Sequence, residues 1–148
     1  MLSGLKSEYD ERHLERINKE IAEHGGHVTE TQVQCYDLND ILIKNNLKNI
    51  DFISIDTEGG ELKILNSINF SIIKVKVIVI ENNYSDPDIL TFMRKKGFYR
   101  VTNFYSDEIY LNPKNFGIIK SFMIKSKLKL NSLYANGGRL YTKFKSAF

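Results

Sequence analysis

Two apolar segments of the sequence end in carboxylates. Asp56 and Glu58 follow the segment DFISI at residues 51–55, and Glu81 ends the segment KVKVIVIE at residues 74–81. A carboxylate at the end of a buried strand is costly to desolvate unless it is paired or faces a cleft. A carboxylate in a cleft can accept the proton of a hydroxyl group, so these three acids are candidates for general base catalysis.

The acids between the two segments also have a purely structural interpretation. Glu58 and Glu61 could stabilise the positive end of a following helix. Gly59 and Gly60 could serve only to permit a tight turn from strand to helix. The residue types alone leave the structural and the chemical interpretations open.

Metal binding is a second chemical alternative. The oxygen atoms of Asp56, Glu81 and Asn82 are of the kind that magnesium and calcium prefer. An acid pair and an amide near a cleft are more often only hydrogen-bonded, so we predict no metal site. The three histidines fall in an N-terminal helical segment or the loop after it, and we expect them to be solvated rather than catalytic: His13, His24 and His27.

Strand and helix patterns alternate around the acids. Apolar β-branched runs predict strands, and apolar residues at helical spacing predict helices. The alternation predicts an α/β fold with a mostly parallel sheet and an antiparallel C-terminal hairpin. The expected order is a helix at 7–23, a strand at 33–36, a helix at 38–46, a strand at 51–55, a helix at 61–68, a strand at 74–81, a helix at 88–97 and a hairpin of strands at 98–104 and 108–111.

Local signals refine this pattern. The continuous Val and Ile content of residues 74–81 is typical of a central strand that is buried on both faces. Asp37, directly before the helical pattern at 38–46, is a plausible N-cap, and Gly97 is the expected stop of the helix at 88–97. Ligands in open α/β sheets bind beyond the carboxyl ends of the strands. Asp56 and Glu81 are expected to lie there, at the ends of adjacent parallel strands and facing a shared pocket.

A longer string of residues resembles the signature of FkbM-type methyltransferases. In that family a segment of the form Ile-Asp-x-x-x-Ile-Asp-x-Glu-Gly-x-Glu covers a sheet strand and the turn after it. IDFISIDTEGGELKIL followed by VIVIENNY is similar to it, and SGLKSEYDERHLERI, GFYRV and DEIYL extend the resemblance over about residues 2–112. The positions that match the signature are Ile50, Asp51, Ile55, Asp56, Glu58, Gly59 and Glu61.

The resemblance implies transfer of a methyl group from S-adenosylmethionine to an oxygen, commonly a hydroxyl of a sugar or a small metabolite. It implies that Asp56 and Thr57 contact the cofactor and that Glu58 shapes the same pocket. Asp56, Glu58 and Glu81 are then the candidate catalytic residues, because methyl transfer needs an oriented acceptor and a group that removes its proton. The sequence does not decide which acid is the base.

The resemblance also implies a doubly wound, Rossmann-like fold, of which this chain covers the C-terminal half. A glycine-rich turn after the first strand would hold the cofactor in such a fold, and the sequence contains no GxGxxG element. We therefore expect residues 1–113 to be the C-terminal half of the methyltransferase domain. We expect an N-terminal half supplied by another polypeptide, or self-association, to cover the apolar sheet.

Charge divides the chain into two parts. Of 21 basic and 18 acidic residues, eight basic ones and no acidic one lie in residues 114–148, which leaves residues 1–113 with a formal charge of −5. We treat residues 114–148 as a basic C-terminal extension and expect a helix that packs on the domain with its lysines solvated. The alternative function is a non-catalytic methyltransferase remnant whose basic extension binds nucleic acid or an anionic membrane.

The composition is that of a globular domain, with 42% hydrophobic and 26% charged residues. The single cysteine, Cys35, excludes an internal disulfide and suits a reducing compartment. The sequence has neither the apolar core of a signal peptide nor an apolar run long enough to span a bilayer. We therefore expect a cytoplasmic protein.

Overall fold

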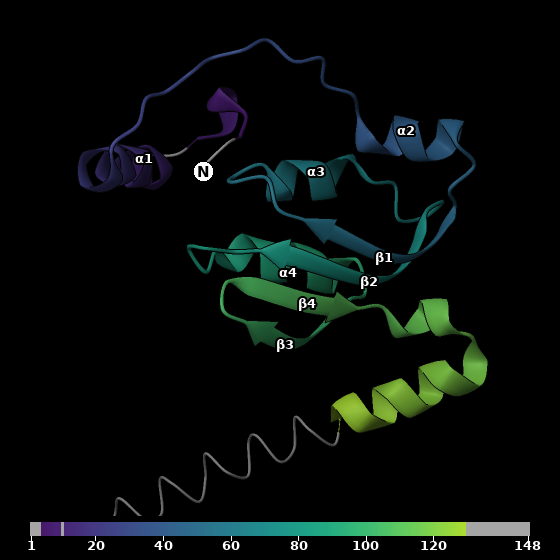
Figure 1. Ribbon diagram of the computed structural model, residues 1–148. Helices are drawn as coiled ribbons and strands as arrows, with labels where there is room; N and C mark the ends of the chain where they lie inside the picture. The colour runs from purple at the N-terminus through teal and green to yellow at the C-terminus, as the bar shows by residue number, and fades with distance from the viewer. Residues whose placement is uncertain (1–3, 10, 130–148) are drawn as a thin grey trace, which may run out of the picture.

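The computed structural model describes residues 4–9 and 11–129 (Figure 1). The described chain is an α/β structure with one four-stranded sheet. A further helix, which carries no label in Figure 1, covers residues 118–129. The labelled elements are η1 (Lys6–Glu8), α1 (Glu11–His24), α2 (Leu38–Lys44), β1 (Asn49–Ile55), α3 (Glu61–Ser67), β2 (Lys74–Glu81), α4 (Pro87–Lys95), β3 (Tyr99–Phe104), β4 (Asp107–Leu111) and η2 (Pro113–Phe116).

The sheet is mixed rather than mostly parallel. Its strand order is β1-β2-β4-β3, in which β1 and β2 are parallel and both pairings of β4 are antiparallel. The predicted hairpin of the last two strands is confirmed, but the prediction of a mostly parallel sheet was wrong. The hairpin places β4 between β2 and β3, so it contributes two antiparallel pairings instead of one at the edge.

Local signals fix the ends of the helices near the sheet. Asp37 caps α2, because its carboxylate accepts hydrogen bonds from the backbone N–H groups of Asn39 at 2.8 Å and Asp40 at 3.3 Å. Asp86 caps α4 in the same way, with Pro87 in the first turn. Gly97, at a φ of 84°, follows the end of α4. The predicted cap and stop at Asp37 and Gly97 are both confirmed.

Helices α3 and α4 cover one face of the sheet (Figure 1). On this face β2 contributes Ile78 and Ile80, which are fully buried and pair in register with β1 and β4. They form a core with apolar residues of both helices and of the segments beside them. Its other members are Leu42, Ile55, Leu65, Ile68, Ile73, Val75, Ile89, Met93, Phe98 and Tyr110.

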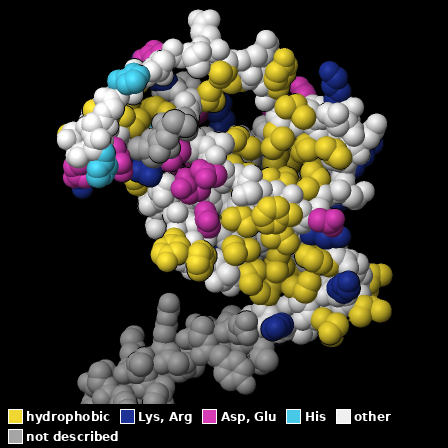
Figure 2. Space-filling view, in the orientation of Figure 1, with side chains coloured by type: hydrophobic (Ala, Val, Ile, Leu, Met, Phe, Trp, Pro, Cys, Tyr) yellow, Lys and Arg dark blue, Asp and Glu magenta, His cyan; other side chains and the backbone are white. Residues whose placement is uncertain are grey.

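The opposite face of the sheet is apolar and largely open. Phe52, Val77, Leu111 and Tyr99 form a row across all four strands. Phe52 is 57% exposed and Tyr99 47% exposed, and Figure 2 shows hydrophobic side chains gathered over the sheet on this side. On β2 itself this face is half-buried at Val77 and Val79. The prediction for the strand at 74–81 was therefore right about its central position and only partly right about burial on both faces.

The strand predicted at residues 33–36 is absent from the described sheet. Residues 25–37 form an extended connection between α1 and α2 without regular structure (Figure 1). Val33 is 62% exposed and Tyr36 71% exposed. A β-prone run forms a strand only where a neighbouring strand satisfies its backbone groups, and this segment has no such neighbour among the residues described. The single helix predicted at 7–23 is likewise divided into η1 and α1.

The helix at 118–129 was predicted, but its packing on the domain was not confirmed. Ile118 is 91% exposed and Phe122 73% exposed. Residues 130–148 of the basic extension lie outside the described residues. None of the helices in residues 4–9 and 11–129 combines the length and the apolar content needed to cross a membrane.

Candidate functional site

The carboxyl ends of β1 and β2 lie side by side. Ile55 pairs with Ile80 in the parallel register, so Asp56 and Glu81 leave the two strands at the same level. One carboxylate oxygen each of Asp56, Glu58 and Glu81 lies within 4.8 Å of the others. The structure thus brings together the three acids that the sequence selected, at the edge of the sheet where ligands of such folds bind.

Glu61 organises the turn between β1 and α3. Its carboxylate accepts hydrogen bonds from the backbone N–H of Thr57 at 2.9 Å, from the hydroxyl of Thr57 at 2.9 Å and from the N–H of Gly59. Glu61 is buried, with 7% of its surface exposed. The structural interpretation therefore holds for Glu61, which is buried and accepts hydrogen bonds from the N–H groups of a half-buried turn. The hydroxyl of Thr57 is already engaged in that turn.

The turn also depends on its backbone conformation. Gly59 has a φ of 123°, and a Cβ at this position would lie 2.9 Å from the carbonyl oxygen of Glu8. Only glycine avoids both the strain and the clash. Glu58, at a φ of 55°, is also in the left-handed region, which turns its side chain toward the N-terminal helix α1.

Helix α1 holds Glu58 by two basic side chains. The guanidinium Nη1 of Arg16 lies 3.2 Å from the Oε2 of Glu58, and the Nδ1 of His13 lies 3.6 Å from the same oxygen. The side chain of His13 is 2% exposed and that of Glu58 is 15% exposed. The expectation that His13 is solvated was therefore wrong, because α1 packs over the strand ends and removes it from water.

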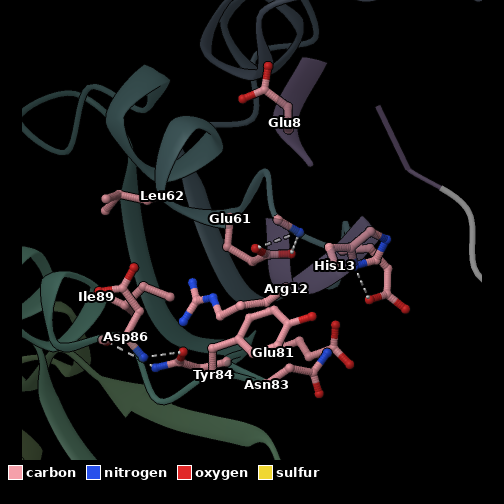
Figure 3. A pocket seen from close by; sticks show the side chains of 13 residues that line it. Glu8, Arg12, His13, Glu61, Leu62, Glu81, Asn83, Tyr84, Asp86 and Ile89 are labelled. Carbon is pink, nitrogen blue, oxygen red and sulfur yellow. Dashed lines mark hydrogen bonds and ion pairs between the residues drawn. The ribbon is translucent and has the colours of Figure 1, made fainter. Parts of the chain in front are cut away.

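Two further contacts fix the N-terminal segment over the site. The Nζ of Lys63 on α3 lies 2.7 Å from the Oε1 of Glu8. The guanidinium of Arg12 lies 4.2 Å from the centre of the Tyr84 ring, a cation–π contact that joins α1 to the loop after β2. Figure 3 shows Arg12 lying across Tyr84, with Glu81 and Asn83 beside them.

These segments enclose a pocket next to the acids. Its wall combines the N-terminal segment, the turn after β1 and the loop after β2 (Figure 3). Glu58 and Glu81 line it, whereas Asp56 lies beside it with an exposed side chain. The other lining residues are Glu8, Arg12, His13, Gly59, Glu61, Leu62, Asn82, Asn83, Tyr84, Asp86 and Ile89.

Crowding of the acids changes the protonation of Glu81. Burial first, and then the negative charges of Asp56 and Glu58, raise the pKa of Glu81 from 4.5 to about 7. A hydrogen bond between Glu81 and Asp56 adds to this rise, and a hydrogen bond from Asn83 opposes it. A carboxyl group with this pKa can both accept and release a proton near neutral pH.

The comparison with known families assigns the domain that contains this pocket. Residues 4–99 match the methyltransferase FkbM domain. The chain belongs to the FkbM methyltransferase family. No curated protein and no solved structure matches the chain significantly.

The matched range of the FkbM domain contains the whole site. It includes the three crowded acids, the basic residues of α1 and Tyr84, and it ends where β3 begins. The helix at 118–129 lies beyond it. The residues that form the pocket therefore all lie within the methyltransferase domain.

Asn82 has a structural role in the FkbM domain. Its Oδ1 accepts a hydrogen bond from the N–H of Asp86 at 2.7 Å, and its Nδ2 donates one to the carbonyl of Asp86 at 3.1 Å. Both polar ends of the amide are thus used to shape the loop before α4. The cation alternative loses its amide ligand, although the three carboxylates alone are close enough together to share an ion.

The sequence analysis missed three basic residues of α1 at the site: Arg12 and His13 line the pocket, and Arg16 contacts Glu58 beside it. A signal was present in the spacing, because His13 and Arg16 are three residues apart and share one face of a helix. Nothing local indicated that this face would pack on Glu58. That contact joins residues 42 positions apart in the chain.

Proposed function

We propose that the chain is an S-adenosylmethionine-dependent O-methyltransferase domain in which Asp56 and Glu81 act on the hydroxyl proton of the acceptor. The observation that carries this proposal is the contact of the Asp56 and Glu81 carboxylates at the ends of two parallel strands, inside the range that matches the FkbM domain. The cofactor supplies an electrophilic methyl group on a positively charged sulfur. A group of three carboxylates suits a cation of this kind.

Glu81 is the proposed base. It lines the pocket and shares a hydrogen bond with Asp56. When the methyl group passes from sulfur to the acceptor oxygen, the sulfur–methyl bond breaks and S-adenosylhomocysteine is the leaving group. The hydroxyl proton would pass to Glu81, where Asp56 stabilises it. Glu58, held by Arg16 and His13, keeps a third negative charge nearby and maintains the proton affinity of the pair.

The acceptor class we propose is a hydroxyl of a sugar or another small polyhydroxylated metabolite. The pocket offers hydrogen-bonding groups from Glu81, Asn83, Arg12 and Tyr84 in place of a continuous apolar wall. Several polar groups directed at one pocket suit a ligand that carries several hydroxyls. The Tyr84 ring, with Arg12 on one face, also provides a flat apolar surface of the kind on which a sugar ring can stack.

We further propose that additional polypeptide, from the same protein or from a partner, completes a Rossmann-like sheet at β1. Within the described sheet β1 pairs only with β2, so one edge of β1 is free. The open sheet face beside it exposes Phe52 and Tyr99. A free edge next to an apolar face is a template for a further strand with its covering helix. Such a strand would bring cofactor-binding groups up to Asp56 and Thr57.

Calorimetric titration with S-adenosylmethionine and with S-adenosylhomocysteine tests the proposal. The expected result is weak or no binding by the chain alone and clear binding once the polypeptide encoded upstream is added. Asp56→Asn is expected to weaken binding in that complex, whereas Asp88→Asn, which changes an exposed acid on α4, leaves it unchanged. Absence of binding in both preparations would remove the enzyme assignment and favour a non-catalytic interaction module.

A further inference from the structure

The helix at residues 118–129 has an apolar stripe that faces solvent. Ile118 and Ile119 are 91% and 78% exposed, and Phe122 and Met123 are 73% and 65% exposed. Positions separated by three or four residues share a helix face, so these four side chains form one continuous stripe. The helix lies at the end of the molecule that is farthest from α1 (Figure 1) and outside the matched FkbM range.

Lysines border this stripe on both sides. Helical geometry places Lys120 and Lys127 along one border and Lys125 and Lys129 along the other. The half-buried side chains lie on the opposite side of the helix: Ser121, Ile124 and Leu128. No acidic residue lies within this helix or follows Glu108 in the sequence. Figure 2 shows basic and hydrophobic side chains next to each other on this part of the surface.

A depression lies where the helix meets η2. It is lined by Lys114, Gly117, Ile118, Ser121, Phe122 and Lys125. Two ammonium groups thus border an apolar floor. This arrangement suits a ligand with a negatively charged head and a hydrocarbon tail.

We propose that helix 118–129 docks the domain on the surface of an anionic lipid bilayer. The stripe from Ile118 to Met123 enters the boundary between headgroups and acyl chains, and the flanking lysines extend to the lipid phosphates. Such a helix lies on the membrane in the plane of the interface. The proposal is independent of methyl transfer and of the cofactor.

The residue types favour lipid over the two other candidate partners. Single-stranded nucleic acid is held by basic side chains along its backbone and by aromatic side chains on which successive bases stack, and this helix has one aromatic residue, Phe122. A symmetric contact with the same helix of a second copy would bring both sets of lysines together, and like charges would then oppose association. An anionic lipid surface can bury the apolar stripe and offers phosphate groups to the lysines.

Intrinsic fluorescence tests the docking directly, because the chain contains no tryptophan. The full chain carrying Phe122→Trp is mixed with vesicles of phosphatidylglycerol and phosphatidylcholine. The expected result is a blue shift of the emission, and binding at least about tenfold weaker to phosphatidylcholine alone. Phe104→Trp is the matched control, because Phe104 is 67% exposed on β3, away from the helix, and its emission is expected not to shift.

Cosedimentation with the same vesicles separates the apolar and the charged contributions. Phe122→Ser is expected to weaken binding about tenfold, whereas Phe104→Ser leaves it unchanged. Lys125→Gln and Lys127→Gln are each expected to weaken binding about fivefold at low salt and less at high salt. Circular dichroism checks that each variant keeps its fold.

Three results would overturn the proposal. The first is equal binding to charged and uncharged vesicles, or binding to neither. The second is salt-sensitive binding to single-stranded RNA by a chain that ignores vesicles. The third is a dimer that Phe122→Ser dissociates, in the absence of any vesicle binding, which would assign the stripe to a second copy.

Discussion

Two groups of carboxylates differ in the side chains and backbone groups that surround their charges. Glu61 receives three donors from its own turn, and Glu108 receives the guanidinium of Arg100 and the hydroxyl of Tyr110. Asp56 and Glu81 instead lie within 4.8 Å of each other and of Glu58. Donors satisfy the first group, whereas the second group is dominated by like charges.

The difference distinguishes carboxylates that stabilise the fold from carboxylates that are available for chemistry. A carboxylate whose acceptor sites are filled stabilises the fold and has little capacity left for a ligand. The hydrogen-bond donor changes as well: burial and the hydrogen bond to Glu108 raise the pKa of Tyr110. A carboxylate crowded by like charge costs stability, and functional sites are where proteins retain such groups. Substitution of an acid shows to which of the two groups it belongs.

The largest effect is expected at the crowded pair. Replacing Glu81 by Gln removes the proposed base, and we expect a loss of about 10²-fold to 10⁴-fold in methyl transfer. The measurement is release of S-adenosylhomocysteine by the completed enzyme with a hydroxylated acceptor. Asp88→Asn is the control and keeps full activity. Full activity of Glu81→Gln would place the base elsewhere.

The next largest effect is expected at Glu108. Its side chain is 10% exposed, and Glu108→Ala leaves Arg100 and the buried hydroxyl of Tyr110 without their acceptor. We expect the free energy of unfolding to fall by about 3 kcal/mol. Urea denaturation measures it. The exposed Glu30 provides the control, because Glu30→Ala removes an acid at the surface and is expected to change stability by less than about 1 kcal/mol.

A smaller loss of stability is expected at Glu61. Glu61→Gln keeps the size of the side chain but replaces one acceptor oxygen with a donor that faces the N–H groups of Thr57 and Gly59. We expect a loss of about 1–2 kcal/mol in the free energy of unfolding. The solvent-exposed Glu11 is the matched control, and Glu11→Gln should have little effect. An equal effect of both variants would mean that Glu61 does not hold the turn.

The smallest expected effect is a gain in the free energy of unfolding, and this gain depends on pH. The pKa of Glu81 is about 7 in the folded protein and 4.5 as its ordinary value. Below pH 4.5 the carboxyl is protonated in both states, and it costs nothing. As the pH rises from 4.5 to about 7, the unfolded chain ionises first, so the folded state loses relative stability.

Glu81→Gln removes this cost and is therefore expected to stabilise the fold at high pH. Because Glu81 is only partly buried, solvent reduces the effect to about 1 kcal/mol at about pH 8, with almost none at about pH 4.5. Urea denaturation of both proteins at the two pH values checks the prediction. A gain in stability of the same size at both pH values would show that crowding of the carboxylates does not cause the gain.

The sequence by itself determined the elements whose signals are local. The cap at Asp37, the stop at Gly97, the bounds of β2 and the final hairpin were all predicted, because each depends on residues within a few positions of one another. The adjacency of Asp56 and Glu81 was also predicted, since parallel strands bring their carboxyl ends to one edge.

Only the tertiary structure decided which surfaces meet. It placed β4 between β2 and β3, left residues 33–36 without a strand partner in the described part of the chain, and set His13 and Arg16 against Glu58. It also left the apolar stripe that begins at Ile118 in solvent. The spacing of apolar residues in the sequence indicates which side of a helix or strand is apolar. Which partner covers that side depends on pairings between residues far apart in the chain, and these are settled by competition among all surfaces of the folded molecule.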